Sequence, residues 1–367
     1  MPKKNQGVDA AKYDKSMGPG AAGGEGLVWR APHARPFRLA GFAWFEQDRV
    51  YRRLPLKPPA PLPQPVNNLA WSTAGGQIQF RTDSRTIAVR VRLRGSAGMV
   101  HMPATGQCGF DLYHGPAGRQ KFLTVTKYPI RATDYEQVLL QNVPTCLRNI
   151  TLNFPLYQGV EEALVGLEPN AALKPPPAYA LDRRIVIYGT SITQGGCAAR
   201  PGMAYTNILS RRLNAEIVNL GFSGNGKGEP ELARIIATVD RCGLFVLDYE
   251  ANAQGLKGLR KTLPGFVRIL RRKHPKTPIL VVSMIRPAGT LIDANGKRAW
   301  TARRVYQRET VARLRKAGDR NIHFCDGSKF LTGDGLEGTV DGVHPTDLGF
   351  LAIANGLEPA LRKILFS

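Results

Sequence analysis

The sequence has no long apolar run, few cysteines and no cysteine pair at metal-binding spacing. No stretch of ~18 consecutive apolar residues is present that would span a bilayer, and residues 1–26 lack the apolar core of a signal peptide. The five cysteines are an odd number, widely scattered and without a Cys-x-x-Cys pair, which argues against a disulfide framework and against a zinc site. We therefore expect no membrane partner and a cytoplasmic protein, or a secreted one from which a signal peptide has been removed.

Positive charge, in contrast, is abundant, with a formal net charge of +23. Residues 1–180 hold 22 basic and 12 acidic residues, and residues 181–367 hold 29 and 16, so the excess is spread over both halves. Diffuse positive charge favours polyanions in general, and an acidic polysaccharide is one partner that it allows. Without a basic tail or stripe, we expect no specific nucleic-acid partner. The oligomeric state is left open.

The amino-terminal half has the pattern of a β domain. Residues 1–26 are polar and rich in glycine, lysine and alanine, which predicts disorder. Between residues 27 and 170, five short segments of strand character are separated by turn residues: Thr86–Leu93, Gly109–Tyr113, Phe122–Thr126, Tyr135–Leu139 and Ile150–Phe154. Strands at this spacing predict an antiparallel, jelly-roll-like β-sandwich over residues 27–170. Residues 171–180, with three consecutive prolines, are typical of a linker.

Beyond residue 181, apolar runs of strand length alternate with helical stretches. The expected strands are Ile185–Tyr188, Ala215–Leu220, Leu244–Asp248, Pro278–Met284 and Ile322–Asp326. The expected helices are Ala204–Leu213, Glu231–Val239, Leu259–Lys273, Arg298–Ala317 and Thr346–Ile364. This alternation predicts the α/β class, as a flavodoxin-like α/β/α doubly wound parallel sheet over residues 181–367. In such a sheet, ligands bind at the carboxyl ends of the strands.

Polar residues that a core does not need follow three of these strands and precede the last helix. Ser191 follows the first strand, and the glycine-rich loop Gly221–Gly228 follows the second, where it exposes backbone N–H groups as an anion site requires. Asn252 follows the third strand. Asp341 and His344 lie in one turn, so the carboxylate can orient the imidazole. Because a serine hydroxyl is inert without such a base and acid, the pattern predicts a nucleophilic serine.

Residues at these four places resemble the motif blocks of the SGNH, or GDSL-type, hydrolases: Gly189-Thr190-Ser191-Ile192, Gly221–Asn225, Asn252 and Asp341-x-x-His344. The resemblance implies that Ser191 is the nucleophile, His344 the general base and Asp341 its partner. It also implies an oxyanion hole formed by the Ser191 N–H, the Gly224 N–H and the Asn252 side chain. The family's chemistry implies no cofactor and no metal.

The third block departs from the family pattern, and the amino-terminal half adds a second resemblance. Where the family has Gly-x-Asn-Asp, this chain has Glu250-Ala251-Asn252-Ala253, in which Asn252 keeps its place after the strand. Gly109-Phe110-Asp111-Leu112-Tyr113 is similar to the Gly-x-Asp-Leu-Tyr motif of the β domain that precedes one branch of the family. That branch includes polysaccharide deacetylases and acyltransferases.

From these features we expect a serine esterase that removes short acyl groups, above all O-acetyl groups of a saccharide, through an acyl-enzyme. The sequence has no long apolar segment that would shelter a fatty acyl chain, so a short acyl group fits better. The partner would then be a small-molecule or saccharide ester. An acyltransferase or a general short-chain esterase would use the same residues, and the sequence does not separate these from a saccharide esterase.

Two alternative hypotheses from other functional classes also have to be considered. Gly221-x-x-x-x-Gly226-Lys227 and the apolar run Leu244–Asp248 imitate the two motifs of a P-loop NTPase, although Gly228 stands where the magnesium-binding Ser or Thr belongs. The basic charge also allows a protein of hydrolase fold that holds a polyanion without turnover. His101 and three other histidines are isolated in the sequence, which favours a surface or structural role.

Overall fold

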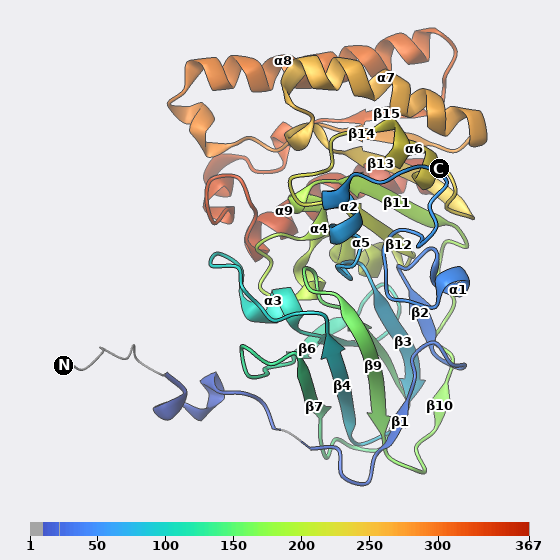
Figure 1. The fold of residues 1–367 in the computed structure, drawn as a ribbon, viewed down its shortest axis with the longest axis vertical. Coiled ribbons are helices and arrows are strands. Elements are labelled where there is room, and N and C mark those ends of the chain that lie inside the picture. Colours follow the sequence, from blue (N-terminus) through green and yellow to red (C-terminus); the bar gives the residue numbers. More distant parts are fainter. Residues whose placement is uncertain (1–9, 22, 367) are drawn as a thin grey trace, which may run out of the picture.

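The computed structural model describes residues 10–21 and 23–366, which form two parts stacked on each other (Figure 1). The part called here the β domain, residues 27–174, contains two antiparallel sheets. The part called the α/β domain, residues 184–365, contains a parallel sheet between helices. Among the described residues, each helix is too short or too polar to span a bilayer.

The β domain is a sandwich of two sheets whose neighbouring strands are all antiparallel. The first sheet has the order β1 (Val28–Arg30), β9 (Val160–Leu167), β4 (Ile87–Leu93) and β7 (Asp134–Leu140). The second has the order β10 (Leu173–Lys174), β3 (Gln77–Thr82), β8 (Arg148–Asn153), β5 (Asp111–His114) and β6 (Lys121–Val125), with β2 (Arg38–Ala40) also paired to β3. Alternate residues of both sheets meet in one apolar core.

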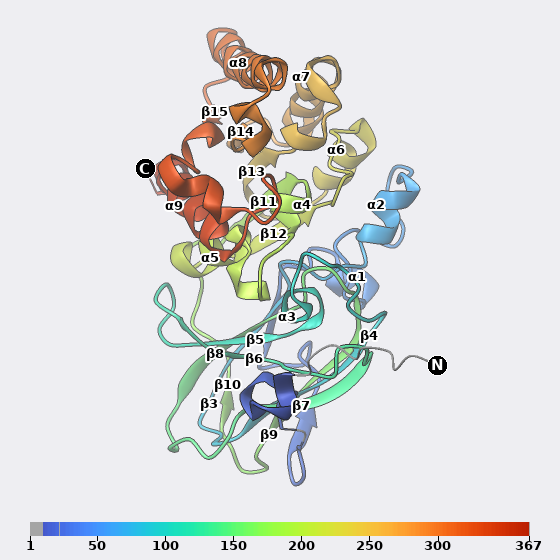
Figure 2. The ribbon, with the colours of Figure 1, turned by 90° about the vertical axis from the view of Figure 1, so that its left-hand side faces the viewer.

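The α/β domain has a five-stranded parallel sheet of order β12 (Ile217–Gly221), β11 (Arg184–Gly189), β13 (Cys242–Asp248), β14 (Ile279–Val282) and β15 (Ile322–Cys325). Helices α5 (Tyr205–Leu213) and α9 (Asp347–Leu365) cover one face. Helices α6 (Pro230–Ile236), α7 (Gly255–Lys273) and α8 (Ala294–Lys316) cover the other (Figure 2). Both faces are buried, which explains why the strands are continuously apolar. This order is the flavodoxin-like one, so the predicted fold class is confirmed.

Short helices complete the structure. The α-helical ones are α1 (Phe45–Asp48), α2 (Gln64–Leu69), α3 (Ala104–Cys108) and α4 (Ser191–Gln194). The 3-10 helices are Ala10–Lys12, Lys15–Met17, Pro201–Met203, Glu250–Asn252, Ala288–Leu291, Gly327–Lys329 and Gly333–Gly338. Most of these lie in the loops at the carboxyl edge of the parallel sheet or between the two domains.

Residues near two of the predicted boundaries contact the β domain. In the segment 1–26, which was predicted to be disordered, the Gly20 N–H donates to the Lys127 carbonyl at 2.6 Å, and the Val138 N–H donates to the Ala21 carbonyl at 3.3 Å. Residues 1–9 and 22 of that prediction lie outside the described residues. In the predicted linker 171–180, β10 pairs with β3 and so belongs to the β domain.

The two domains share buried cores. Trp44, Leu54 and Val66, from the segment around α1 and α2, lie in one cluster with Tyr188 and the residues under α6 and α7. On the opposite face of the parallel sheet, Met102 of the β domain packs in the cluster that contains Ile192. Burial of this kind fixes the β domain against the edge of the sheet at which the predicted site residues lie.

Candidate active site

The turn that carries Ser191 is built by close packing and a cap. At Gly189, the end of β11, an added Cβ would lie 2.0 Å from Thr193 Oγ1 and 2.6 Å from the Asp248 carbonyl, so glycine is required there. Thr190 is the N-cap of α4, and its hydroxyl accepts from the Ile192 N–H at 3.3 Å. Helix α4 is followed by its C-cap residue Gly195, whose φ of +105° favours glycine. Ser191 is thereby fixed at the first position of the helix.

The structure brings Ser191, His344 and Asp341 into one hydrogen-bonded chain. Ser191 Oγ lies 2.9 Å from His344 Nε2, and His344 Nδ1 lies 2.7 Å from Asp341 Oδ2. Because an ionised carboxylate can only accept, Nδ1 carries the proton and Nε2 is left to accept from the serine hydroxyl. Ser191 is 8% exposed, while the His344 and Asp341 side chains are 28% and 40% exposed. This is the arrangement by which an imidazole can take a proton from a serine.

Asp341 is held as a carboxylate by the turn that also carries His344. Partial burial raises the pKa of Asp341, but the backbone N–H groups of His344 and Val343, at 2.7 and 3.0 Å, and the His344 ring outweigh this and lower the pKa to about 2. Gly342, between Asp341 and Val343, has a φ of +83°, a backbone conformation that favours glycine. The carboxylate therefore stays charged at any ordinary pH.

Gly224 and Asn252, the two further residues predicted for an oxyanion hole, follow strands that flank β11. Gly189 at the end of β11 pairs with Gly221 of β12 on one side and with Asp248 of β13 on the other, so both loops leave the same edge of the sheet. The backbone N–H groups of Ser191 and Gly224 form no hydrogen bond with the described residues. Gly224 has a φ of +67° and open space around it. Free donors of this kind are what an anion requires.

The departure in the third motif block has a structural reason. Glu250, which replaces the family's glycine, is 2% exposed and forms an ion pair with Arg303 of α8 at 3.0 Å. Its carboxylate also accepts from the Met284 N–H at 2.8 Å and from the Gln307 side chain. Burial raises the pKa of Glu250, and these contacts counteract that effect. Glu250 thus ties the Asn252 loop to α8 and to the segment that follows β14. The Asn252 Oδ1 atom is buried and has no hydrogen-bond partner among the described residues.

Asp248, at the end of β13, supports the turn that carries Ser191. Its Oδ2 atom accepts from the Tyr205 hydroxyl at 2.7 Å and from the Thr193 hydroxyl at 3.0 Å. Burial raises the pKa of Asp248 to about 7, although these two hydrogen bonds lower it. Asp248 therefore joins β13, α4 and α5 underneath Ser191.

The β domain contributes Arg53, which braces the strand leading to Gly224. Arg53 is fully buried and donates to the carbonyls of Leu69 at 2.7 Å and Ser72 at 2.8 Å, and to the carbonyl of Gly221 at the end of β12. Burial lowers the pKa of Arg53 to about 9, so the guanidinium is still charged at neutral pH. Arg53 therefore connects the β domain with the end of β12 in the α/β domain.

The Gly-x-Asp-Leu-Tyr stretch also acts across that boundary. Asp111 is fully buried and accepts from Asn153 Nδ2 at 2.7 Å and from the Gly202 N–H at 2.6 Å, and it pairs with Arg200 at 3.2 Å. Burial raises the pKa of Asp111, and Arg200 and these hydrogen bonds oppose the rise. Tyr113 accepts a hydrogen bond from Arg200 as well. The motif thus fixes the segment that follows Ser191 and α4.

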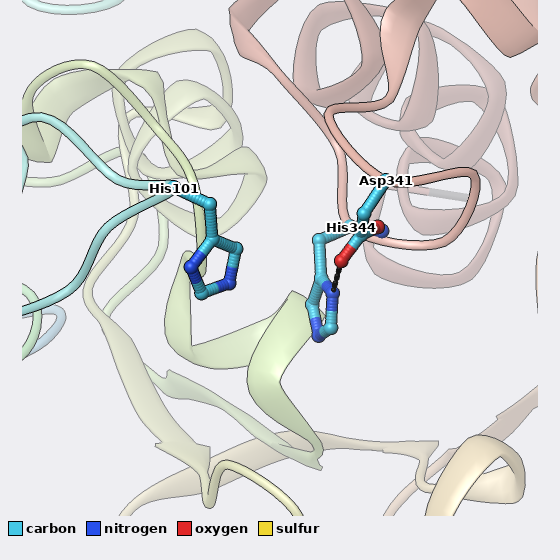
Figure 3. A group of neighbouring side chains, drawn as sticks. All are labelled: His101, Asp341 and His344. Carbon is cyan, nitrogen blue, oxygen red and sulfur yellow. Dashed lines mark hydrogen bonds and ion pairs between the residues drawn. The ribbon is translucent and has the colours of Figure 1, made fainter.

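His101, for which the sequence favoured a surface or structural role, is exposed, and it also lies next to the predicted site. Its exposed ring lies beside His344, with ring centroids 5.9 Å apart at 72° (Figure 3). Because the two histidines belong to different domains, no local pattern in the sequence would have brought them together. Among the described residues, His101, Asp341 and His344 are the group able to offer a metal ion one ligand atom each, all within 4.8 Å of one another. Both nitrogens of His344 already form hydrogen bonds, so a metal would have to displace one of them.

The structure of the loop Gly221–Gly228 contradicts the P-loop hypothesis. Helix α6 begins only at Pro230, after Lys227-Gly228-Glu229. At Gly226, an added Cβ would lie 2.0 Å from the Gly189 carbonyl, and the Gly226 N–H donates to the Phe222 carbonyl at 3.0 Å. The loop is therefore a closed turn packed against β11, whereas a P-loop is an open cradle for phosphates at a helix N-terminus.

This fold, with a serine, a histidine and an aspartate joined at the carboxyl edge of a parallel sheet, defines a class of hydrolases, and the family comparisons agree. Residues 182–362 match the model of the GDSL-like lipase/acylhydrolase family. Residues 27–173 match the model described as the N-terminus of Esterase_SGNH_hydro-type. The chain belongs to the GDSL-like lipase/acylhydrolase family.

Solved structures with the same two-part architecture extend the comparison. A protein from Bacteroides ovatus ATCC 8483, described as a GDSL-like lipase, is 32% identical, with a TM-score of 0.82, and the match covers 93% of this chain and 98% of that one. The salicylyl-acyltransferase SsfX3 from a tetracycline biosynthetic pathway is 23% identical, with a TM-score of 0.75 and coverage of 93% and 98%. A family two carbohydrate esterase from Clostridium thermocellum, in complex with cellohexaose, is 17% identical, with a TM-score of 0.55 and coverage of 80% and 93%. No curated protein matches the chain.

Proposed function

We propose that this protein is a serine esterase that hydrolyses short-chain acyl esters, in particular O-acetyl groups on a saccharide. The observation that carries the proposal is the hydrogen-bonded chain from Ser191 through His344 to Asp341, at 2.9 and 2.7 Å. The family, whose members are acylhydrolases by description, supports the reaction class. In this proposal, Ser191 is the nucleophile, His344 the general base and Asp341 the residue that orients the imidazole.

The reaction would run through an acyl-enzyme. Ser191 Oγ attacks the ester carbonyl carbon while His344 Nε2 takes the hydroxyl proton, and the charge that develops on the ring is balanced by Asp341. Collapse of the tetrahedral intermediate breaks the bond to the alcohol oxygen, which receives the proton from His344 Nε2. A water molecule then attacks the acyl-serine with His344 again as base, releasing the carboxylic acid and restoring the Ser191 hydroxyl.

The negative charge on the carbonyl oxygen needs donors that are fixed before the reaction starts. We assign this role to the Ser191 N–H, the Gly224 N–H and the Asn252 amide. The two backbone N–H groups make no hydrogen bond with the described residues. The loop that carries Asn252 is anchored through Glu250 to Arg303 and Met284. These supports would keep the donors in place when substrate is absent.

The saccharide part of the proposal rests on the surroundings of Ser191. The β domain reaches the site with His101, which is polar and exposed. A wall of this kind suits a hydrated alcohol group better than a fatty acyl chain. Carbohydrate esterases are among the proteins that share this fold, which makes acetylated saccharides the first substrates to test. The net charge of +23 would favour the approach of an acidic polysaccharide.

The test is acetate release from acetylated xylan, glucomannan, xyloglucan and acetylated monosaccharides, with Ser191→Ala as the control. We expect wild-type enzyme to release acetate from at least one member of the panel and the variant to release none above background. Efficient cleavage of long-chain esters, or acyl transfer to an added alcohol, without acetate release from any saccharide would refute the saccharide assignment and leave the Ser191 chemistry standing.

A further inference from the structure

The segment that carries His101 is fixed in place by a buried side chain. Gln107 is 2% exposed, and its amide oxygen accepts from the N–H groups of Gly98 and Met99 at 2.9 and 3.0 Å. Its amide nitrogen donates to the carbonyls of Met99 and Met102 at 3.2 and 2.6 Å. Gln107 therefore holds the backbone on both sides of His101, which makes the position of this histidine a built feature of the fold.

Met102, the next residue, anchors the same segment in the other domain. It is 4% exposed and lies in the core cluster that contains Ile192, directly after Ser191. Thr105, at the start of α3, donates to the Ala199 carbonyl at 2.6 Å. The His101 backbone is thus attached to the α/β domain near the Ser191 turn, and its side chain is directed toward His344 (Figure 3).

The His101 ring is free to bind a ligand. It is exposed, and its nitrogens form no hydrogen bond or ion pair with the described residues. One of its nitrogens lies within 4.8 Å of a ring nitrogen of His344 and of an Asp341 oxygen. Since a hydrogen bond to a hydroxyl oxygen is about 2.8 Å long, a single hydroxyl group, or two neighbouring oxygens of one ligand, would fit between the two rings.

The chemical groups around the space between His101 and His344 indicate which ligand group would fit there. His344 must return its proton to the alcohol oxygen of the ester, so that oxygen lies against His344 and the atoms next to it lie toward His101. A neutral imidazole offers one donor and one acceptor, which matches a hydroxyl group. The Asp341 carboxylate disfavours an anionic group at this place, and an alkyl chain would leave the His101 nitrogens unpaired.

We propose that His101 is a substrate-binding residue that hydrogen-bonds a hydroxyl group on the alcohol side of the ester, next to the scissile bond. The β domain thereby sets a preference for esters of polyols, such as partly acetylated sugars, over esters of alcohols that have no second hydroxyl. This inference rests on the proposed esterase function and names the part of the substrate that the site recognises.

The experiment compares two acetate esters in the wild-type protein and three variants. 4-Nitrophenyl acetate has no hydroxyl group on its alcohol side, whereas a monoacetylated methyl glycoside has several. We expect His101→Ala to raise KM for the glycoside about 2- to 10-fold, the effect of one hydrogen bond, with kcat within about twofold of wild type. Both constants for 4-nitrophenyl acetate should stay unchanged, and His101→Asn should recover part of the loss.

His33→Ala is the matched control, because His33 is also an exposed histidine of the β domain but lies beside Phe45, outside the site. It should leave both substrates unaffected. Equal losses on both esters in His101→Ala, or no loss on either, would overturn the inference. Wild-type enzyme that cleaves 4-nitrophenyl acetate but no glycoside would instead refute the saccharide assignment, and with it the polyol preference, and that result is visible without any variant.

Discussion

The Asp111 carboxylate in the β domain accepts a hydrogen bond of 2.6 Å from the backbone N–H of Gly202 in the α/β domain. Asp111 is fully buried and also pairs with Arg200 at 3.2 Å. The segment that it holds follows α4 and leads into α5, so the geometry around the Ser191 turn depends on a residue from the other domain. The β domain is therefore part of the framework of the site.

Replacing Asp111 tests that dependence. Asp111→Ala leaves the Arg200 guanidinium without its carboxylate and the Gly202 N–H without an acceptor, and we expect a loss of about 2–5 kcal/mol in the free energy of unfolding. Asp111→Asn keeps an acceptor for Gly202 and should lose less. Chemical denaturation of the three proteins measures both values. Equal stability of wild type and Asp111→Ala would mean that the two domains are not coupled through this residue.

Asn252→Ala tests the third donor of the proposed oxyanion hole. Loss of the amide should lower kcat for an acetate ester by about 10²–10³-fold, with little change in KM, because the hydrogen bond forms only as charge develops. Asn252→Asp, which has the same shape without the N–H donor, should be similarly impaired. A fall of less than about threefold in both variants would show that this loop supplies no donor.

Asp248 should make stability depend on pH. Its pKa is raised to about 7 in the folded protein, so between the ordinary carboxyl value of 3.8 and about 7 the folded state binds more protons than the unfolded state. Stability from this group is therefore lost as the pH rises through that window. Asp248→Asn keeps an acceptor for Tyr205 and Thr193 and removes the titration.

The measurement is the difference in Tm between Asp248→Asn and wild type at pH 5 and at pH 8. We expect the variant to gain relative to wild type at the higher pH. A difference that does not vary with pH would contradict the assignment of a raised pKa to Asp248.

Asp341 should behave in the opposite way, because its pKa is lowered to about 2. The carboxylate remains ionised down to that pH, so its protonation should not contribute to the acid limb of a pH–rate profile recorded above about pH 4. Asp341→Asn should reduce kcat by about 10²–10⁴-fold, because the amide no longer fixes Nδ1 as the protonated nitrogen of His344. Retention of more than a tenth of wild-type kcat would argue against an orienting role.

The arrangement of the α/β domain could be predicted because its signals are local. Strands buried on both faces give unbroken apolar runs, and each expected strand and helix beyond residue 181 is found within a few residues of its predicted bounds. In the β domain, β3 was missed because its polar residues are buried. Gln77 donates to Asn153 at 2.9 Å, and Gln79 donates to Gln77 at 2.9 Å, so a polar residue there does not mark the exposed face.

The residues of the candidate site also include some that local sequence motifs predict and others that such motifs do not predict. Ser191, Asp341 and His344 stand in short motifs of recognisable residue types, so the sequence was sufficient to predict that these three side chains meet. Arg53, Asp111 and His101 act by reaching from one domain to the other, over sequence separations that no periodicity reveals. Glu250 was recognised as a departure from the family pattern, but only its burial against Arg303 explains it.

The most direct test of the account is whether Ser191 is the residue that becomes acylated. Wild-type enzyme and Ser191→Ala are treated with a fluorophosphonate, which labels activated serines, and the labelled peptide is identified by mass spectrometry; turnover of 4-nitrophenyl acetate is measured in parallel. We predict a single label on Ser191, none in the variant, and turnover lowered by about 10³-fold or more at unchanged Tm. Labelling of another residue, or unchanged turnover in Ser191→Ala, would contradict the account.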